Sequence, residues 1–417
     1  MTRLRLGARD TFRSFSVRNF RLFFGGQLIS QIGNWLTLVT QTLLVLQLTG
    51  NGLAVGLLTA CQFAPVLFIG AWAGLVADRS DKRRLLMIVQ TIAMAQSFAL
   101  AGLAFMGNPP VAAIFGVALI GGFTIAFDNP ARRAFVVEMV PEDHVHNAVS
   151  LNSALMTGAR VVGPALAGIL IHVAGYGWCF TLDGLSYLAV LAGLWMMRTA
   201  ELRPSPVAER AKGQVREGFR YARRVPELWV PLVMMAVIGT LAFNFQVVMP
   251  LLVERTFGGN EATFTLLFSV LSVGSLIGAL ATARRRTISV GHVVVTATGF
   301  GVAMLVFAAS PSLAAAFPLG LLLGATSIAF MTASTAIVQV ESAPQMRGRV
   351  LALQAIVFLG STPIGGPIVG YICDVFGPRA GLVVGGVAAL LAAGWGSLAW
   401  RAHATRKVST ADVPVAA

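Results

Sequence analysis

The sequence predicts an all-α membrane protein with twelve transmembrane helices in two pseudo-symmetric six-helix bundles. Hydrophobic residues make up 56% of the 417 residues, and charged residues make up 12%, about half of the ~25% found in ordinary soluble domains. Apolar runs near or above the ~20 residues needed to cross a bilayer recur along the whole chain. The second half of the chain also repeats sequence features of the first half.

The apolar runs define the expected helices in order. They lie at about 20–48, 52–76, 84–106, 111–133, 148–172, 177–197, 228–253, 262–283, 288–309, 312–339, 350–372 and 380–400. A basic stretch at 198–227 interrupts them between the sixth and the seventh. We therefore expect an N-terminal bundle at 1–197, a cytoplasmic linker at 198–227, and a C-terminal bundle with a cytoplasmic tail at 228–417.

The basic residues predict the orientation. Along the alternating loops, 28 of the 31 Lys and Arg residues fall on one side, Arg255 and Arg379 fall on the other, and Arg160 lies inside a helix. Because positive residues concentrate on the cytoplasmic side, both termini are expected in the cytoplasm. The chain itself is expected in the inner (cytoplasmic) membrane. The net charge of +14 thus follows from membrane topology and does not indicate nucleic-acid binding.

The linker has helical periodicity. Val215, Phe219 and Ala222 recur at helical spacing opposite a set of arginines. This pattern predicts a short amphipathic helix lying on an anionic lipid leaflet. A flexible charged tether is the alternative interpretation.

An internal repeat supports the two-bundle architecture. Both halves contain Glu-x-x-Pro followed 23 residues after the proline by Gly-Pro, at Glu138–Pro164 and at Glu341–Pro367, with a constant offset of 203 residues. A duplicated six-helix half explains four positions at one offset. Asp78 maps to Ala281, so its carboxylate exists in one half only.

The loop Gly74–Arg84 concentrates charge between two apolar runs. Asp78 follows the C-terminal end of a helix, where the macrodipole disfavours a carboxylate, so it needs a cation or the N-terminal end of another helix. One interpretation is a solvated turn that only fixes orientation. The other is a conformational latch between the two halves, formed by Gly74, Asp78, Arg79, Lys82 and Arg83, with Asp128 as a carboxylate partner for the cations.

Polar side chains within the first and seventh spans predict a substrate cavity. In the first span, polar residues at spacings of three and four share one face, which indicates either a water-filled cavity or helix-packing contacts. Amides and hydroxyls favour an amphipathic or neutral cargo over a strongly ionic one. The candidate cavity residues are Gln27, Gln31, Asn34, Gln41, Asn244 and Gln246, with Ser30 and Thr37 on the same stripe.

The fifth span carries Arg160 beside Gly163, Pro164 and Gly168. Small residues let another backbone approach closely, and the proline bends the helix. Arg160 lies about 18 Å from the far surface at 1.5 Å per residue. It needs a carbonyl cluster, a cavity or a carboxylate, and Asp183 is the nearest embedded acid.

Enzymatic and metal-dependent functions find no support in the sequence. Five histidines are scattered, and three cysteines form no C-x-x-C pair. Neither a metal-ligand spacing nor a phosphate-binding glycine loop is present. We expect no catalytic residues, no metal and no cofactor.

The loop and the fifth span resemble signatures of the major facilitator superfamily. The loop is similar to G-x-L-A-D-R-x-G-R-K-R, with departures at Val76, Asp81 and Lys82, and the fifth span is similar to the antiporter signature g-x-x-x-G-P-x-x-G-G. The runs beginning at Asp128, Glu217 and Arg347 resemble the branch that contains the enterobactin exporter and related drug efflux pumps.

This resemblance implies a monomeric exporter of drug-like compounds or siderophores that works by proton antiport. Two bundles would rock about a central site, Gly74 would allow close approach of the second and eleventh helices, and the N-terminus of the eleventh would stabilise Asp78. Proton coupling comes from the resemblance alone, because the region around Gly121 lacks the arginine of many proton-coupled members. An uptake permease or a non-transporting sensor or scaffold is the alternative.

Overall fold

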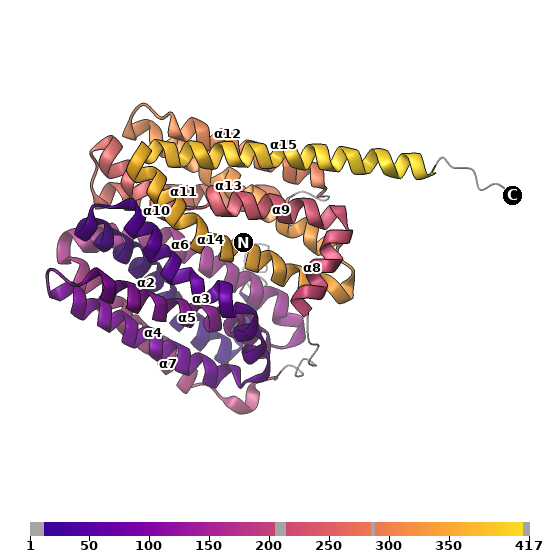
Figure 1. Ribbon diagram of the computed structural model, residues 1–417. Helices are drawn as coiled ribbons and strands as arrows, with labels where there is room; N and C mark the ends of the chain where they lie inside the picture. Colours follow the sequence, from indigo (N-terminus) through magenta and orange to yellow (C-terminus); the bar gives the residue numbers. More distant parts are fainter. Residues whose placement is uncertain (1–11, 205–213, 285–287, 412–417) are drawn as a thin grey trace, which may run out of the picture. The chain divides into compact units, whose positions relative to one another are not determined.

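The computed structural model describes residues 12–204, 214–284 and 288–411 of the chain (Figure 1). Within these ranges the structure is helical, and 12 helices or helix combinations are long and apolar enough to cross a membrane. The predicted fold class is therefore confirmed. Parts of the predicted basic segments, namely residues 1–11, 205–213 and 285–287, lie outside the described residues.

The helices of the first half begin and end within a few residues of the predicted spans. They are α2 (Arg18–Thr49), α3 (Gly52–Arg79), α4 (Lys82–Phe105), α5 (Val111–Glu138), α6 (Val145–Ala174) and α7 (Tyr176–Trp195). Short turns of 3-10 helix, η1 (Arg13–Ser16), η2 (Glu142–His144) and η3 (Thr199–Glu201), flank them. Each long helix covers the apolar run from which it was predicted, except for one or two residues at the ends of α4 and α7.

The second half departs from the prediction in one span. Its elements are α8 (Gln214–Arg224), α9 (Pro226–Leu241), α10 (Phe245–Leu251), the π-helical turn η4 (Leu252–Thr256), α11 (Glu261–Ala283), α12 (Val290–Ala308), α13 (Leu313–Glu341), α14 (Pro344–Phe376) and α15 (Pro378–Ala411). The seventh span is thus not one helix but α9, α10 and η4 in succession.

The chain forms two compact units, and each includes one short segment from the other half of the sequence. Unit 1 comprises 1–50, 61–210 and 260–269, and unit 2 comprises 51–60, 211–259 and 270–417. The main boundary falls inside the predicted linker. The start of α3 therefore belongs to the unit built mostly from the second half, and the start of α11 belongs to the other unit.

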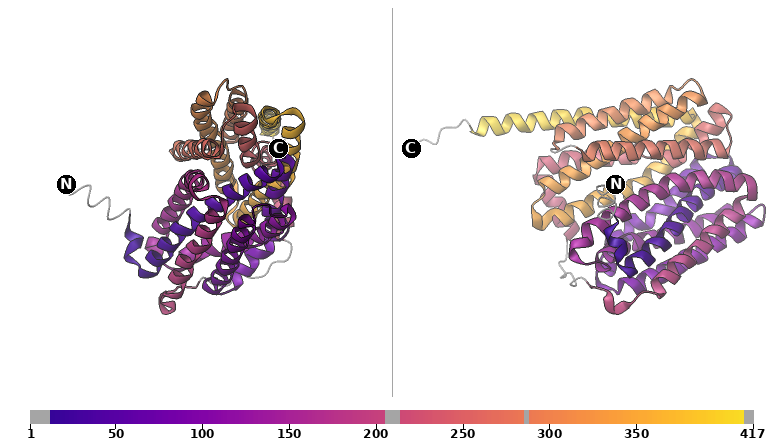
Figure 2. Two further views of the ribbon diagram at one scale, coloured as in Figure 1. Left: turned by 90° about the vertical axis from the view of Figure 1, so that its left-hand side faces the viewer. Right: turned by 180° about the vertical axis from the view of Figure 1, so that it is seen from behind.

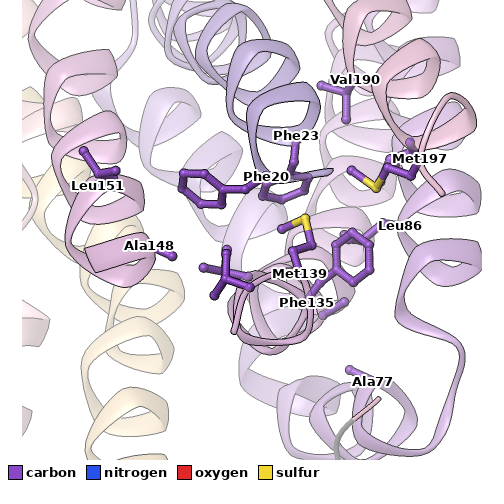
Figure 3. Close-up of a cluster of buried hydrophobic side chains, with 14 residues drawn as sticks. Phe20, Phe23, Ala77, Leu86, Phe135, Met139, Ala148, Leu151, Val190 and Met197 are labelled. Atoms are coloured by element: carbon purple, nitrogen blue, oxygen red, sulfur yellow. The ribbon is translucent and has the colours of Figure 1, made fainter. Parts of the chain in front are cut away.

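Unit 1 is built on α2, which packs against α6 and α7, while α4 packs between α5 and α7. These helices run alongside one another in two further views (Figure 2). Figure 3 shows how Phe20 and Phe23 of α2 meet Phe135 of α5 and Met139, the residue after α5, in one buried apolar cluster, which Leu86 of α4 also joins. The cluster fixes this end of the helices against one another.

In unit 2, α15 packs on α9 and α12, and α8 packs on the start of α14. The predicted linker helix is confirmed as α8, with Ala222 buried and Phe219 exposed. Glu217 Oε2 lies 2.7 Å from Arg349 Nη1, and the Tyr221 hydroxyl accepts a hydrogen bond from the Ala343 amide (3.1 Å). The contact of this helix with lipid stays a prediction.

Candidate functional site

Lys82, the first residue of α4, forms a buried ion pair in the predicted latch loop. Its Nζ lies 2.8 Å from Glu138 Oε1, and the two side chains are 7% and 6% exposed. The expectation that Asp128 supplies the carboxylate for the loop cations is wrong for Lys82. Glu138 ends α5 and was singled out in the sequence only as part of the repeat, so the Glu-x-x-Pro motif was the available signal.

Arg83 is also held within unit 1, and again not by Asp128. Its Nε donates to the Leu194 carbonyl (2.6 Å) and its Nη2 to the Trp195 carbonyl (3.3 Å). These carbonyls end α7, where a cation complements the helix dipole. Asp81, at a position where the family usually has glycine, caps α4 by accepting the Arg84 amide (3.0 Å).

Asp78 and Arg79 lie at the end of α3 with exposed side chains. Within the described part of the chain, no ion pair or side-chain hydrogen bond holds Asp78. A Cβ added at Gly74 would meet no atom within 4 Å, so this structure does not itself require glycine there. The latch role of these residues stays a prediction about another conformation.

Asp128 belongs to a network on α5. Its Oδ2 lies 2.9 Å from Arg132 Nη2, and its Oδ1 accepts from Gln90 Nε2 (2.7 Å). Arg132 Nη1 in turn donates to Gln27 Oε1 (3.4 Å), which also accepts from Gln31 Nε2 (3.2 Å). Two predicted cavity residues are therefore linked to this ion pair.

The other polar residues of α2 have separate protein partners. Gln41 Oε1 accepts from Gln62 Nε2 (2.9 Å), whereas Asn34 is half-buried. Gln27, Gln31 and Gln41 are at most 3% exposed. In this structure the stripe thus divides into several buried contacts within unit 1, and its role in lining a cavity stays a prediction.

Asp183 is a buried carboxyl of α7 that is 1% exposed. Its Oδ2 accepts from the Thr37 and Ser97 hydroxyls, both at 2.7 Å. No cation of the described residues forms an ion pair with it. A Cβ at Gly33 would collide with Oδ1, so glycine on α2 makes room for this carboxyl. The suggested pairing of Asp183 with Arg160 is absent.

Arg160 on α6 lies over the Trp35 ring of α2, with its guanidinium carbon 5.6 Å from the ring centroid. Its Nε is buried without a hydrogen-bond acceptor, and no carboxylate in the described chain pairs with it. Cation–π contact contributes about 0.5–2 kcal/mol, whereas a charge placed in the bilayer interior costs at least about 2.5–3.5 kcal/mol. The ring therefore compensates only part of the cost.

The small residues of α6 give close helix contacts within unit 1. A Cβ at Gly163 would collide with Trp35 Cβ, and a Cβ at Gly168 would collide with Thr265 at the start of α11. Pro164 lies inside the helix and removes the amide that would bond to the Arg160 carbonyl. The predicted close backbone approach on this face is confirmed.

The two predicted cavity residues of the second half lie at the break between α9 and α10. Asn244 is 4% exposed, its Nδ2 donates to the Thr240 carbonyl (2.7 Å), and its Oδ1 is buried without a donor. Gln246 is half-buried. Phe243 contacts Phe358 beside them, with ring centroids 5.2 Å apart. Interrupted membrane helices often form binding sites in transporters.

Sequence reasoning missed a contact at the other end of α3. Asp374 of α14 accepts the free amides of Gly52 and Leu53, both at 2.8 Å. Arg255 Nη2 lies 2.9 Å from its Oδ1. A Cβ at Gly56 would collide with the Gly366 carbonyl, so the two backbones are in direct contact. The only signal in the sequence was Gly366-Pro367, which was used as a repeat marker.

Comparison with known proteins identifies the group to which these features belong. The family described as transmembrane secretion effector matches residues 9–413. The staphyloferrin A transporter of Staphylococcus aureus is 24% identical over 263 residues, which span 62% of this chain and 66% of that protein. Macrolide efflux protein A of Streptococcus pyogenes is 22% identical over 83% of this chain and 87% of its own length. The multidrug efflux pump Tap of Mycolicibacterium fortuitum is 27% identical over 84% and 87%.

Solved structures show the same fold. A nucleoside transporter, NupG, superposes with a TM-score of 0.74 at 13% identity, over 92% of this chain and 99% of that one. A bacterial homologue of the human lysosomal transporter Spinster gives a TM-score of 0.69 at 17% identity, over 94% and 97%. The shared fold agrees with the family match over residues 9–413, and that match shows that this chain belongs to the transmembrane secretion effector family of the major facilitator superfamily and is a multi-pass membrane transporter, not an enzyme.

Proposed function

We propose that this protein is a secondary active exporter of small organic molecules, driven by proton antiport across the cytoplasmic membrane. The relatives named as a staphyloferrin A transporter, a macrolide efflux protein and a multidrug efflux pump support a drug-like or siderophore cargo. The chain would act as a monomer with both termini in the cytoplasm.

The observation that carries the export direction is the contact surface of α6. Gly163 and Gly168, which match the antiporter signature, admit Trp35 of α2 and Thr265 of α11 so closely that any side chain would collide. These close contacts support the proposal that the signature packs helices in this chain, as it is expected to do in an antiporter. An uptake permease would not need this motif.

Two contacts on α3 support an alternating mechanism. Asp374 caps the first turn of α3, while Asp78 at the last turn has no partner among the described residues. A latch that engages in one conformation only should be open in the other. Under this proposal, the structure would represent the state in which Asp374 caps α3 and the Asp78 latch is disengaged.

Asp183 supports proton coupling. A carboxylate buried among hydroxyls, without a cation, carries a large desolvation cost that proton binding removes. The Thr37 and Ser97 hydroxyls are able to donate to the charged form and to accept from the neutral form by rotating. We assign the transported proton to this carboxyl.

The test is efflux by cells that lack their own pumps, with a panel of drug-like compounds and siderophores. A supported proposal gives lower cell-associated compound in expressing cells, and a protonophore abolishes the difference. Asp183→Asn should lose this gradient-driven efflux yet still exchange cargo down its gradient, while the exposed Asp81→Asn retains both. Greater accumulation in expressing cells would instead show uptake, and unchanged accumulation across the panel would favour a scaffold.

A further inference from the structure

In the described part of the chain, the charged side chains that are buried or half-buried in the membrane-spanning helices are compensated except at Arg160, and at Arg18, which stands at the first residue of α2 with its Nη1 also unpartnered. Lys82 pairs with Glu138, and Arg132 pairs with Asp128. Asp183 receives hydroxyl donors. Arg160 has neither an ion pair nor a hydrogen bond, and only the face of Trp35 approaches it.

Arg160 differs from Asp183 in that it cannot become neutral by exchanging a proton. A carboxylate becomes neutral by binding a proton, but an arginine side chain keeps its charge in proteins. Arg160 therefore has no internal means of neutralisation. In this conformation, a counter-charge for Arg160 would have to come from another molecule, namely an anion.

The surroundings of Arg160 add an aromatic surface and further donors. Trp35 contacts Phe268 of α11, with ring centroids 6.5 Å apart. On α2, residues 27, 31 and 35 follow at intervals of four, which places them on one helix face. Gln27 Nε2 on that face is a second buried donor without an acceptor. Two buried donors without acceptors, one on α6 and one on the face of α2 that carries Trp35, indicate a ligand rich in acceptors.

We infer that Arg160 binds the anionic group of the cargo beside Trp35, and that this exporter carries amphipathic organic anions such as aromatic carboxylates. The inference rests on the proposed function and narrows its substrate class. A carboxylate matches the planar fork of guanidinium donors. The apolar body of the cargo would pack beside the Trp35 and Phe268 rings. The amide-rich stripe alone had favoured a neutral or amphipathic cargo, and the unpaired guanidinium favours the charged form.

The test measures binding to the purified full chain in detergent, without any gradient, so that it does not depend on transport. The probes are 2-naphthoate and its neutral isostere 2-naphthamide, and the readout is the ligand-induced shift in melting temperature. We expect 2-naphthoate to raise the melting temperature and 2-naphthamide to raise it far less. Arg160→Gln should abolish the difference, and Arg160→Lys should weaken 2-naphthoate binding at least tenfold. Arg379→Gln is the control, because it removes an arginine that donates to the Ser310 carbonyl. It should leave the difference between the two probes unchanged.

Several results would overturn the inference. They are equal shifts with the two probes, no shift up to the solubility limit of 2-naphthoate, and an undiminished shift in either Arg160 variant. Arg160→Lys keeps the charge, so it supplies the answer if Arg160→Gln fails to fold. A parallel titration with phosphatidylglycerol tests a lipid headgroup as the anion, and an equal Arg160-dependent shift would assign the site to lipid. Binding without efflux would contradict the proposed function only, and efflux without binding would contradict this inference only.

Discussion

Lys82 and Glu138 each stand at the unfavourable end of their own helix, and each supplies the charge that the other lacks. Lys82 begins α4, where the helix dipole is positive, and Glu138 ends α5, where it is negative. Their contact at 2.8 Å is almost fully buried. The amide of Arg203 also donates to the Glu138 carbonyl (2.9 Å), so the pair joins α4, α5 and the start of the linker.

Breaking this pair should destabilise the protein strongly. Lys82→Met removes the cation that pairs with the buried Glu138 carboxylate, and breaking a buried ion pair in this way costs about 3–5 kcal/mol. Lys82→Met combined with Glu138→Leu should recover much of the loss because neither charge remains. Thermal unfolding of the purified protein measures both variants. Glu201→Gln, which removes the exposed pair of Arg198 with Glu201, is the control and should change stability by less than about 1 kcal/mol. A Lys82→Met variant as stable as the original protein would show that the pair contributes nothing.

Asp78→Asn should impair transport far more than folding. The side chain is exposed and without a partner here, so its removal costs this conformation little. The loss should fall on the conformation in which Asp78 is capped. Efflux and membrane content of the variant are measured side by side, with Asp81→Asn as the neighbouring control. Normal efflux at equal expression would identify Asp78 as an ordinary surface residue.

Asp374→Asn should shift the conformational equilibrium in the direction opposite to that of Asp78→Asn. Asn keeps one acceptor oxygen but loses the charge, and a charge at a helix N-terminus contributes about 0.3–2 kcal/mol, which changes a conformational ratio by about 2–30-fold. Thr59 is 2% exposed, and Thr59→Cys in a cysteine-free background reports whether the start of α3 has opened. We expect faster modification of this cysteine in the Asp374→Asn variant. Combining Asp78→Asn with Asp374→Asn should bring the rate back toward the original, and additive acceleration would argue against opposed latches.

Arg160→Leu should insert and fold at least as well as the original chain yet lose coupled export. The substitution removes a desolvation cost of at least about 2.5–3.5 kcal/mol. Arg160→Lys should be partly defective because it keeps the charge and loses the planar fork. A purely structural arginine predicts the reverse, with a misfolded Leu variant and a fully active Lys variant. Melting temperature together with efflux distinguishes the two accounts.

Topology is tested by labelling single cysteines from outside intact cells. The charge distribution predicts that Gly107–Pro110 and Glu254–Glu261 face outward and that α8 faces the cytoplasm. Cysteines at Asn108 and Asn260 should react with an impermeant reagent, whereas a cysteine at Arg220 should react only after the membrane is opened. Reaction at position 220 in intact cells would show that the chain has the opposite orientation to the one predicted.

Hydropathy and charge predicted the architecture well because lipid imposes length and orientation on every span. The helix bounds of α2 to α7 follow the apolar runs, and the helix in the linker follows from the spacing of Phe219 and Ala222. The break between α9 and α10 was not predicted, because Asn244 and Gln246 are single polar residues within an apolar stretch long enough to span the membrane as one helix. A backbone interruption of this kind depends on close packing, here of Gly365 against the Thr240 carbonyl.

The hydrogen-bond and ion-pair partners of the buried polar residues were predicted less well than the helix faces on which these residues lie. Helical spacing placed the polar residues of α2 on one face, but it does not say which neighbouring helix meets each residue. Thr37 binds Asp183, Gln41 binds Gln62, and Gln27 binds Arg132. Asp128 was assigned to the loop cations on the basis of charge, yet a cation four residues along its own helix was nearer.

The cap on the first turn of α3 has a consequence for biogenesis. Gly52 and Asp374, whose carboxylate accepts a hydrogen bond from the Gly52 amide, are 322 residues apart in the sequence. At about 5–20 residues per second, the ribosome needs roughly 15–60 s to make the chain between them. Throughout that interval the amides of Gly52 and Leu53 have no acceptor from α14, and water or lipid headgroups must solvate them. The nascent first half therefore waits for the eleventh span before this turn is completed.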